Sequence, residues 1–258
     1  MASRRRAESM AGSGTEQRTG ERRGAGDRRE ERADRILQAA GELLTALGYR
    51  RVSISEVAER AGVGKGTVYL HFPTKEALFL SVLMRSQERM LRAEIAEMRA
   101  DPAAILPGRI ASAAYRMVDR DPVARTVVTG DTETLGVLAR TAATEVAELS
   151  RLRFETLGAH FRLLDEHGLL RPGGTPEERM YGYAATVAGF LVIGALSPFD
   201  LPGGEAPAEL LGRTVRDAFE AGPEPDPERL RAAAPAAIGL FQNLLDRLVE
   251  EIARQKSS

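Results

Sequence analysis

Apolar residues recur at helical spacing along most of the chain, and this pattern predicts an all-α protein. A first helix is expected from about Glu31 to Leu47, because one face of that segment collects the residues Ile36, Ala40, Leu43, Leu44 and Leu47. Gly48 follows as its stop signal. We find no alternating run of apolar and polar residues of the kind that predicts a β-strand.

A second helix is predicted to begin at Ser53 and a third by Lys65. The run Ser53-Ile54-Ser55-Glu56 is typical of a capping box, in which the serine oxygen and the glutamate each accept from a backbone amide. Gly62 is expected to end the second helix. A fourth helix is expected after Thr74 and should stop near Asp101.

Three later helix starts are marked by an N-cap residue followed by proline: Asp121-Pro122, Thr175-Pro176 and Asp226-Pro227. The last helix carries a seam for packing against another helix, formed by Ala234, Ile238, Phe241, Leu245, Leu248 and Ile252. Pro235 is expected to kink or split this helix near its start.

The short helix that begins by Lys65 has an unusual outward face. Val68 and Phe72 lie four residues apart and should point into a core, at about 100° per residue. The opposite face then holds Gly66, Thr67, Tyr69 and Leu70. Glycine permits close approach, and threonine and leucine methyls match thymine methyls, so this face suits the DNA major groove. The alternative is a plain packing corner with Tyr69 half-buried.

The segment from Ile36 to Leu83 resembles the TetR (tetracycline-repressor-type) regulators. The resemblance rests on ordered motifs at matching spacing: Gly48-Tyr49, Ser53, Val57-Ala58, Ala61-Gly62-Val63, Tyr69-Leu70-His71-Phe72 and Lys75-Glu76-Ala77-Leu78. It departs from the family at Gly64, where Ser or Thr is frequent. A glycine there removes a hydroxyl that would be available to a phosphate.

The resemblance implies a set of DNA contacts: Ser53, Lys65, Thr67, Tyr69, His71 and Lys75. Tyr69, His71 and Lys75 would mainly hold phosphates, while Lys65, Gly66 and Thr67 would lie closest to base edges. Leu70 joins this set from its place on the outward face. The predicted organisation is a disordered tail (1–30), a three-helix helix-turn-helix domain (31–84, motif 53–72) and a helical bundle for ligand binding and dimerisation (85–258).

Charge is divided unevenly along the chain. Residues 1–75 carry 15 Lys+Arg against 10 Asp+Glu, while the whole chain has a net charge of −1. A basic N-terminal end is expected to meet a polyanion. The Arg-rich tail is either a DNA-binding arm or a solvated segment with balanced charge. With no cysteine and no signal peptide in view, we expect a cytoplasmic protein.

The uncharged segment 181–199 has nearly the length of a membrane span, but its Gly and Ala content and Pro198 favour a helix buried in a core or subunit interface. We therefore expect no membrane contact and a homodimer built from the helix near 181–196 and the last helix, 235–254. A ligand pocket is expected before this interface, with Tyr115, Arg153, His160, Tyr181 and Tyr183 as candidate contacts.

No catalytic or metal-binding constellation is recognisable. His160 and His167 lie two helical turns apart, whereas helical metal pairs usually lie one turn apart. The chain contains no phosphate-binding loop, dinucleotide turn or nucleophile elbow. The sequence therefore favours a repressor that binds a near-palindromic operator as a homodimer and is released by a small-molecule effector, with no cofactor. A ligand-dependent activator and an all-α enzyme with an unrecognised cofactor are the alternatives.

Overall fold

The computed structural model describes residues 28–129, 143–196, 204–222 and 224–255, and within these ranges the chain is helical, as predicted. A first helix spans residues 28–47. The other elements are α2 (Ile54–Ala61), α3 (Lys65–His71), α4 (Lys75–Ala100), the 3-10 helix η1 (Pro102–Ile105), α5 (Pro107–Arg120), α6 (Pro122–Thr129), α8 (Ala143–Glu166), α9 (Pro176–Leu196), α10 (Ala206–Phe219) and α11 (Pro227–Gln255).

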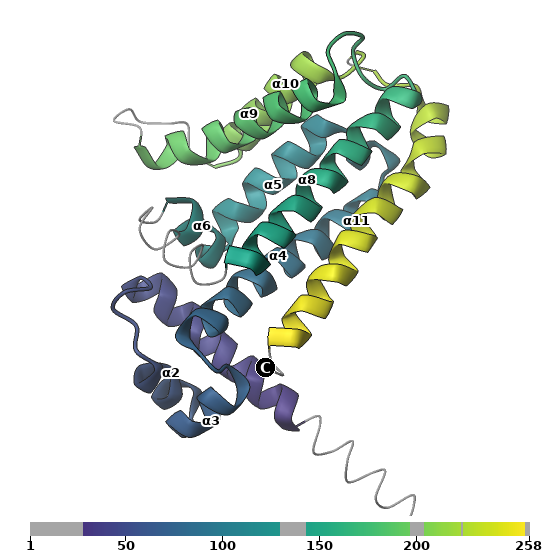
Figure 1. Cartoon of the computed structure of the whole chain (residues 1–258). Helices are drawn as coiled ribbons and strands as arrows, with labels where there is room; N and C mark the ends of the chain where they lie inside the picture. The colour runs from purple at the N-terminus through teal and green to yellow at the C-terminus, as the bar shows by residue number, and fades with distance from the viewer. Residues whose placement is uncertain (1–27, 130–142, 197–203, 223, 256–258) are drawn as a thin grey trace, which may run out of the picture.

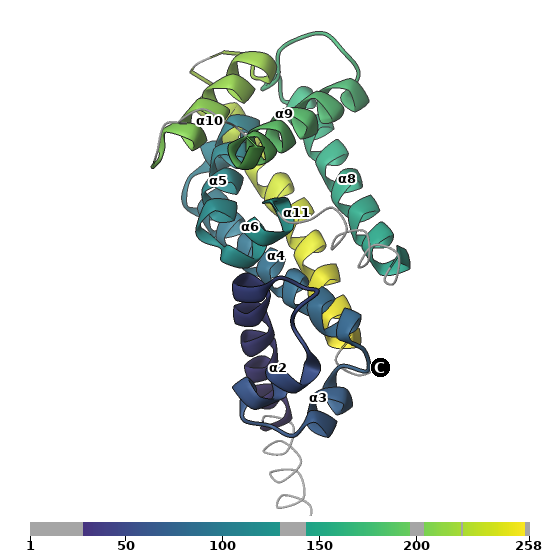
Figure 2. The ribbon, with the colours of Figure 1, turned by 90° about the vertical axis from the view of Figure 1, so that its left-hand side faces the viewer.

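The molecule has a small head and a larger body. The first helix, α2 and α3 form the head, and α4 leads from it into the body (Figure 1). In the body α8 and α11 run beside α4 and α5, while α9 and α10 lie across the end that is far from the head (Figures 1 and 2). The C-terminal end of α11 returns to the side of the head.

The head closes around one hydrophobic core. Ile36, Val57, Val68 and Phe72 are fully covered there, together with the start of α4. The edge of the Tyr49 ring meets Phe79 with ring centroids 5.2 Å apart. The capping box at Ser53 is present, and Gly62 ends α2 in the left-handed region with φ of 66°, so both local predictions are confirmed.

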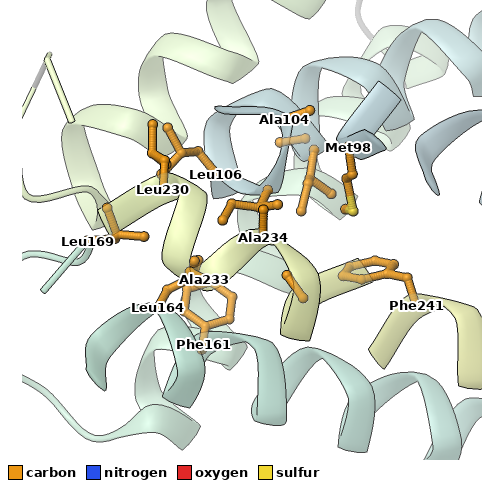
Figure 3. Packing of buried hydrophobic residues seen from close by; sticks show 14 of the residues in the cluster. Met98, Ala104, Leu106, Phe161, Leu164, Leu169, Leu230, Ala233, Ala234 and Phe241 are labelled. Atoms are coloured by element: carbon orange, nitrogen blue, oxygen red, sulfur yellow. The ribbon is translucent and has the colours of Figure 1, made fainter. Parts of the chain in front are cut away.

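A second core fills the body. Met98 from α4, Phe161 and Leu164 from α8, and Phe241 from α11 converge there (Figure 3). The apolar seam of α11 is thus used inside the chain, against α4, η1 and α8, and it is not available to a second subunit. This corrects the prediction that the seam of the last helix forms a dimer interface.

Two further predictions about the chain's course need correction. Pro235 lies inside α11, which runs from Pro227 to Gln255, so the predicted split is wrong, while a kink at Pro235 stays a prediction. Residues 28–30, predicted to belong to a disordered tail, are the first turn of the first helix, while the rest of that tail lies outside the described residues. No helix in the described ranges has both the length and the apolar character needed to cross a membrane.

Helices α5 and α10 approach each other closely through glycine. A Cβ atom placed on Gly108 would lie 2.6 Å from the carbonyl oxygen of Gly212. The Gly108 amide also donates to the buried Glu220 carboxylate at 2.8 Å. This contact fixes the start of α5 against the end of α10, and backbone rather than a flexible side chain opposes any added methyl group.

We expect Gly108→Ala to destabilise the protein by about 1–3 kcal/mol, because the added methyl overpacks a backbone contact. Gly239→Ala is the matched control, since a Cβ at that exposed helical position meets nothing within 4 Å. It should stabilise α11 by about 0.5–1 kcal/mol through helix propensity. Urea unfolding of both variants measures the difference, and equal stabilities would contradict the packing described.

Candidate nucleic-acid interface

Helix α3 is fixed by two residues and presents the rest of its surface outward. Val68 and Phe72 are fully buried in the head core, as their spacing predicts. The opposite side carries Tyr69, which is 44% exposed, and Leu70, which is 71% exposed. Gly66 is exposed and Thr67 is half-buried beside them. A leucine this exposed contributes nothing to the core, so the apolar surface of α3 is available to a partner.

The ends of α2 and α3 supply polar groups near this surface. Ser53 is exposed, and its hydroxyl accepts from the Glu56 amide at 3.3 Å while donating to the Glu56 carboxylate at 2.7 Å. Lys65 is the exposed first residue of α3. Gly64 occupies the N-cap position without a side-chain hydrogen bond, so an α3 amide remains open to an acceptor outside the head.

His71 does not lie on the outward face. It is 3% exposed at the end of α3, so its side chain is enclosed by the head. The sequence resemblance made it a phosphate contact, and its burial argues against that role. His71 follows Val68 by three residues, or about 300° of rotation, so the two side chains lie on the same side of α3.

Lys75 is engaged within the head. Its Nζ donates to the Tyr49 carbonyl oxygen at 2.7 Å and lies 4.4 Å from the centroid of the Tyr49 ring. Partial burial lowers the pKa of Lys75, an effect that Glu76 and Glu56 oppose. The Tyr49 hydroxyl in turn donates to Glu76 at 3.0 Å. Lys75 therefore ties the start of α4 to the turn after the first helix, and its predicted phosphate contact stays a prediction.

Three polar residues from separate helices lie within electrostatic range of one another in the body: Glu94 of α4, Arg153 of α8 and Tyr183 of α9. We call them the polar triad. Burial raises the pKa of Glu94 to about 7, and the charge of Arg153 opposes that rise. Burial lowers the pKa of Arg153 and raises that of Tyr183, and each of the three side chains acts electrostatically on the other two. Arg153 and Tyr183 were predicted ligand contacts; each influences the pKa of the other, and their contact with a ligand stays a prediction.

Glu94 was not predicted, although the sequence contains its signal. It lies three residues after Leu91 and four before Met98, so it interrupts an apolar stripe of α4. Both of these neighbours pack in the body core. An acid in such a stripe is enclosed by protein without being part of the core.

The other three predicted ligand residues are placed differently. Tyr115 is half-buried on α5 and packs against the body core. His160 is 1% exposed, donates from Nε2 to the Ile105 carbonyl at 2.8 Å and meets the Phe241 ring, so it packs as a core histidine. Burial lowers its pKa to about 4. Tyr181 is 76% exposed, which corrects its assignment to an internal pocket.

A cleft of about 700 Å³ separates the head from the body. Its lining comes from the first helix, α4 and the start of α6. Asp121 caps α6 and accepts from both Ser86 and Arg89 of α4 at 2.7 Å. Burial opposes ionisation of Asp121, but the hydrogen bonds from Ser86 and Arg89 outweigh it and hold its pKa below the usual range. The charged groups of this cleft are thus paired with one another.

Comparison with known proteins places the similarity mainly in the head. Residues 36–82 match the family model for bacterial regulatory proteins of the tetR family. The HTH-type transcriptional activator FasR of Mycolicibacterium smegmatis is 38% identical over 84 residues, 30% of this chain and 38% of FasR. The HTH-type transcriptional repressor KstR of Rhodococcus jostii is 46% identical over 61 residues, 24% of this chain and 29% of KstR. The matches thus span well under half the length of either relative.

Solved structures match over more of the chain. A TetR-family regulator from Agrobacterium tumefaciens superposes with a TM-score of 0.56 at 23% identity, covering 75% of this chain and 100% of that one. FadR from Bacillus subtilis, in complex with stearoyl-CoA, gives 0.53 at 15% identity, covering 70% and 96%. At these identities the likeness shows a shared fold that extends through the body.

The raised pKa of Glu94 predicts a pH-dependent stability. Between its ordinary value of 4.5 and about 7 the folded protein keeps a proton that the unfolded chain releases, so stability falls as pH rises through this window. Glu94→Gln should remove about 1–2 kcal/mol of that fall, allowing for the partial solvent access of Glu94. Urea unfolding at pH 5 and pH 8 measures it, with the exposed Glu209→Gln as control. An unchanged slope in Glu94→Gln would refute the assignment.

Proposed function

We propose that the chain is a transcriptional regulator of the TetR type that binds a near-palindromic DNA operator as a homodimer, because its head matches the tetR family model over residues 36–82 and its fold resembles that of a TetR-family regulator. The observation that carries this proposal is the outward face of α3, with Leu70 71% exposed beside Tyr69. Inserted into a major groove, this face brings methyl groups to thymines and leaves the Gly66 side open for close approach. A protein with this role acts in the cytoplasm.

We propose that the regulator is a repressor that a small molecule releases from its operator. A dimer bound at an operator blocks transcription by occupying the DNA, so it needs no surface that binds RNA polymerase. The relatives include both a named repressor, KstR, and a named activator, FasR, so a ligand-dependent activator is the second candidate. The described residues contain no group of three His, Cys, Asp or Glu suited to a metal, and we assign no catalytic role.

The proposed dimer face lies on α9 and α8. Tyr181, Val192 and Ile193 of α9 are 76%, 40% and 54% exposed, and Phe154 of α8 is 52% exposed. Ala185, Ala188 and Gly189 are also exposed and lie on the same helix at helical spacing. An apolar surface of this kind suits a second copy of the chain, and in this proposal α8 replaces the last helix, which the sequence analysis expected in the interface. Two recognition helices would then lie about 35 Å apart, one DNA turn.

The head and body are joined so that movement can pass between them. Asp121 binds Ser86 and Arg89, and Val123 of the same turn packs within 3.5 Å of the Cβ position of Gly41 in the first helix. Arg85 of α4 pairs with Asp34 of the first helix. We propose that an effector in the body changes the position of α4 and α6, and that this junction carries the change to α3.

Leu70→Ala should weaken binding to the operator by about tenfold or more, because a direct base contact is worth about 1–3 kcal/mol. Duplex DNA selected from a random pool by the unaltered protein serves as the operator. Leu210→Ala, which removes a leucine that is 45% exposed on α10, is the matched control and should bind normally. The proposal fails if the unaltered protein shows no DNA sequence preference at low salt. It also fails if Leu70→Ala binds the operator as tightly as the unaltered protein does.

Ile193→Glu should raise the dimer dissociation constant by at least about tenfold, because it places a charge in an apolar interface. Val249→Glu alters an apolar residue that is 37% exposed on α11 and should leave the dimer intact. Sedimentation velocity measures both variants. If Val249→Glu abolishes the dimer and Ile193→Glu does not, the interface is formed by the last helix and not by α9.

Asp121→Ala removes the tie between α6 and α4. We expect faster amide hydrogen exchange in the first helix as well as in α6 and the middle of α4, because the junction then opens locally more often. Asp246→Ala, an exposed acid on α11, is the control. Exchange that rises in α6 alone would show that Asp121 is a local cap with no part in coupling.

A further inference from the structure

The first helix of the head carries an exposed basic surface formed by Arg28, Arg29, Arg32 and Arg35, which we call the arginine stripe. We propose that the arginine stripe binds DNA phosphates outside the major groove that α3 reads, an inference that rests on the proposed function. The stripe then adds affinity and salt dependence to operator binding, and the choice of base sequence is left to α3.

The arginine stripe follows one side of the first helix. Its four side chains are exposed, whereas Ala33 and Ile36 of the same helix are buried in the head core. Arg28, Arg32 and Arg35 follow one another at steps of four and three residues, which keeps their side chains within about 60° around the helix axis. The stripe therefore contributes no packing to the core, and its surface faces solvent.

The acids of the first helix do not neutralise this surface. Asp34 lies on another side of the helix, where it pairs with Arg85 of α4. Within the described residues, Arg29 and Arg35 form no ion pair. Arg32 donates from Nε to a backbone carbonyl one turn earlier at 3.0 Å, which leaves the rest of its guanidinium open. Open guanidinium groups match the oxygens of a phosphate in charge and in geometry.

The arginine stripe and α3 lie at the same end of the head. In both views the start of the first helix and α3 are on the side of the head that is far from the body (Figures 1 and 2). Ala33 and Ile36 of the first helix share one core with Val68 and Phe72 of α3, so the two helices keep a fixed relation. When α3 enters a major groove, the stripe is brought to the same duplex, where the strands beside the groove present phosphates.

The two surfaces differ in the DNA chemistry that they fit. The outward face of α3 is apolar at Leu70 and suits base edges, whereas the arginine stripe offers only cations and suits the sugar-phosphate backbone. The stripe also precedes residues 36–82, over which the chain matches the tetR family model. It is therefore a feature of this chain that the family match does not supply.

Fluorescence anisotropy over a series of KCl concentrations tests the inference, with the full chain and the duplex that the unaltered protein selects from a random pool. The salt slope is that of the logarithm of the association constant against the logarithm of the salt concentration. Arg32→Gln and Arg35→Gln are made singly and together, since glutamine keeps the helix propensity and removes the charge. Each should reduce the magnitude of the salt slope by about 2, because both subunits change and each phosphate contact contributes about 0.9. Binding should weaken about tenfold or more.

Two further variants separate contact with DNA from a change in net charge. Arg231→Gln removes an exposed arginine near the start of α11, on the body, and should leave the salt slope unchanged. Glu31→Gln removes an exposed acid at the edge of the arginine stripe and should tighten binding. An unchanged salt slope in the double variant, or an equal fall in Arg231→Gln, would overturn the inference. Circular dichroism confirms that each variant is folded.

The ratio of operator affinity to the affinity for a scrambled duplex distinguishes this inference from the proposed function. The arginine variants should keep that ratio, because phosphate contacts carry no base sequence, whereas Leu70→Ala should lower it. A ratio of one in the unaltered protein refutes the proposed function. A high ratio with an unchanged salt slope in the double variant refutes the role of the arginine stripe alone.

Discussion

The burial of one continuous helix in two cores is the constraint on which the rest of the structure depends. The first turns of α4 place Leu78, Phe79 and Val82 in the head, and its last turns place Ile95 and Met98 in the body. Between them, Leu80 and Met84 pack against α11. The helix is a rod of 26 residues, or about 39 Å at 1.5 Å per residue. The head therefore has no independent orientation, because it shares this rod with the body.

The parts of the fold that depend on neighbouring residues were predictable from the sequence. The capping box at Ser53, the glycine stop at Gly62 and the helix starts after Asp121, Thr175 and Asp226 all involve contacts within a few residues of chain. The outward face of α3 followed from helical geometry alone, since Val68 and Phe72 fix its rotation. Where a contact is local, its sequence signal is complete, and these predictions are confirmed by the structure.

The rest depends on contacts that the sequence does not specify. A lysine that binds a DNA phosphate and one that donates to a carbonyl 26 residues away have the same local pattern, so the bond from Lys75 to the Tyr49 carbonyl could not be predicted. A proline inside a helix usually breaks or kinks it. Pro235 does not split α11, which packs against both α4 and α8. Arg153 and Glu94 were each predictable as polar residues beside an apolar stripe, but the electrostatic influence of one on the other was not, because they belong to different helices.

The head and the body are linked because α4 contributes to both cores. The middle of α4 is also bonded to the start of α6, since Ser86 donates to Asp121 at 2.7 Å. A rigid helix carries a shift along its axis, so no relay of side chains is needed between its two ends. At the junction, Arg85 of α4 pairs with Asp34 of the first helix. Arg89 of α4 pairs with Asp121 at the start of α6. A movement of α4 would strain or exchange these pairs, and this is the route by which the proposed effector would change the orientation of α3.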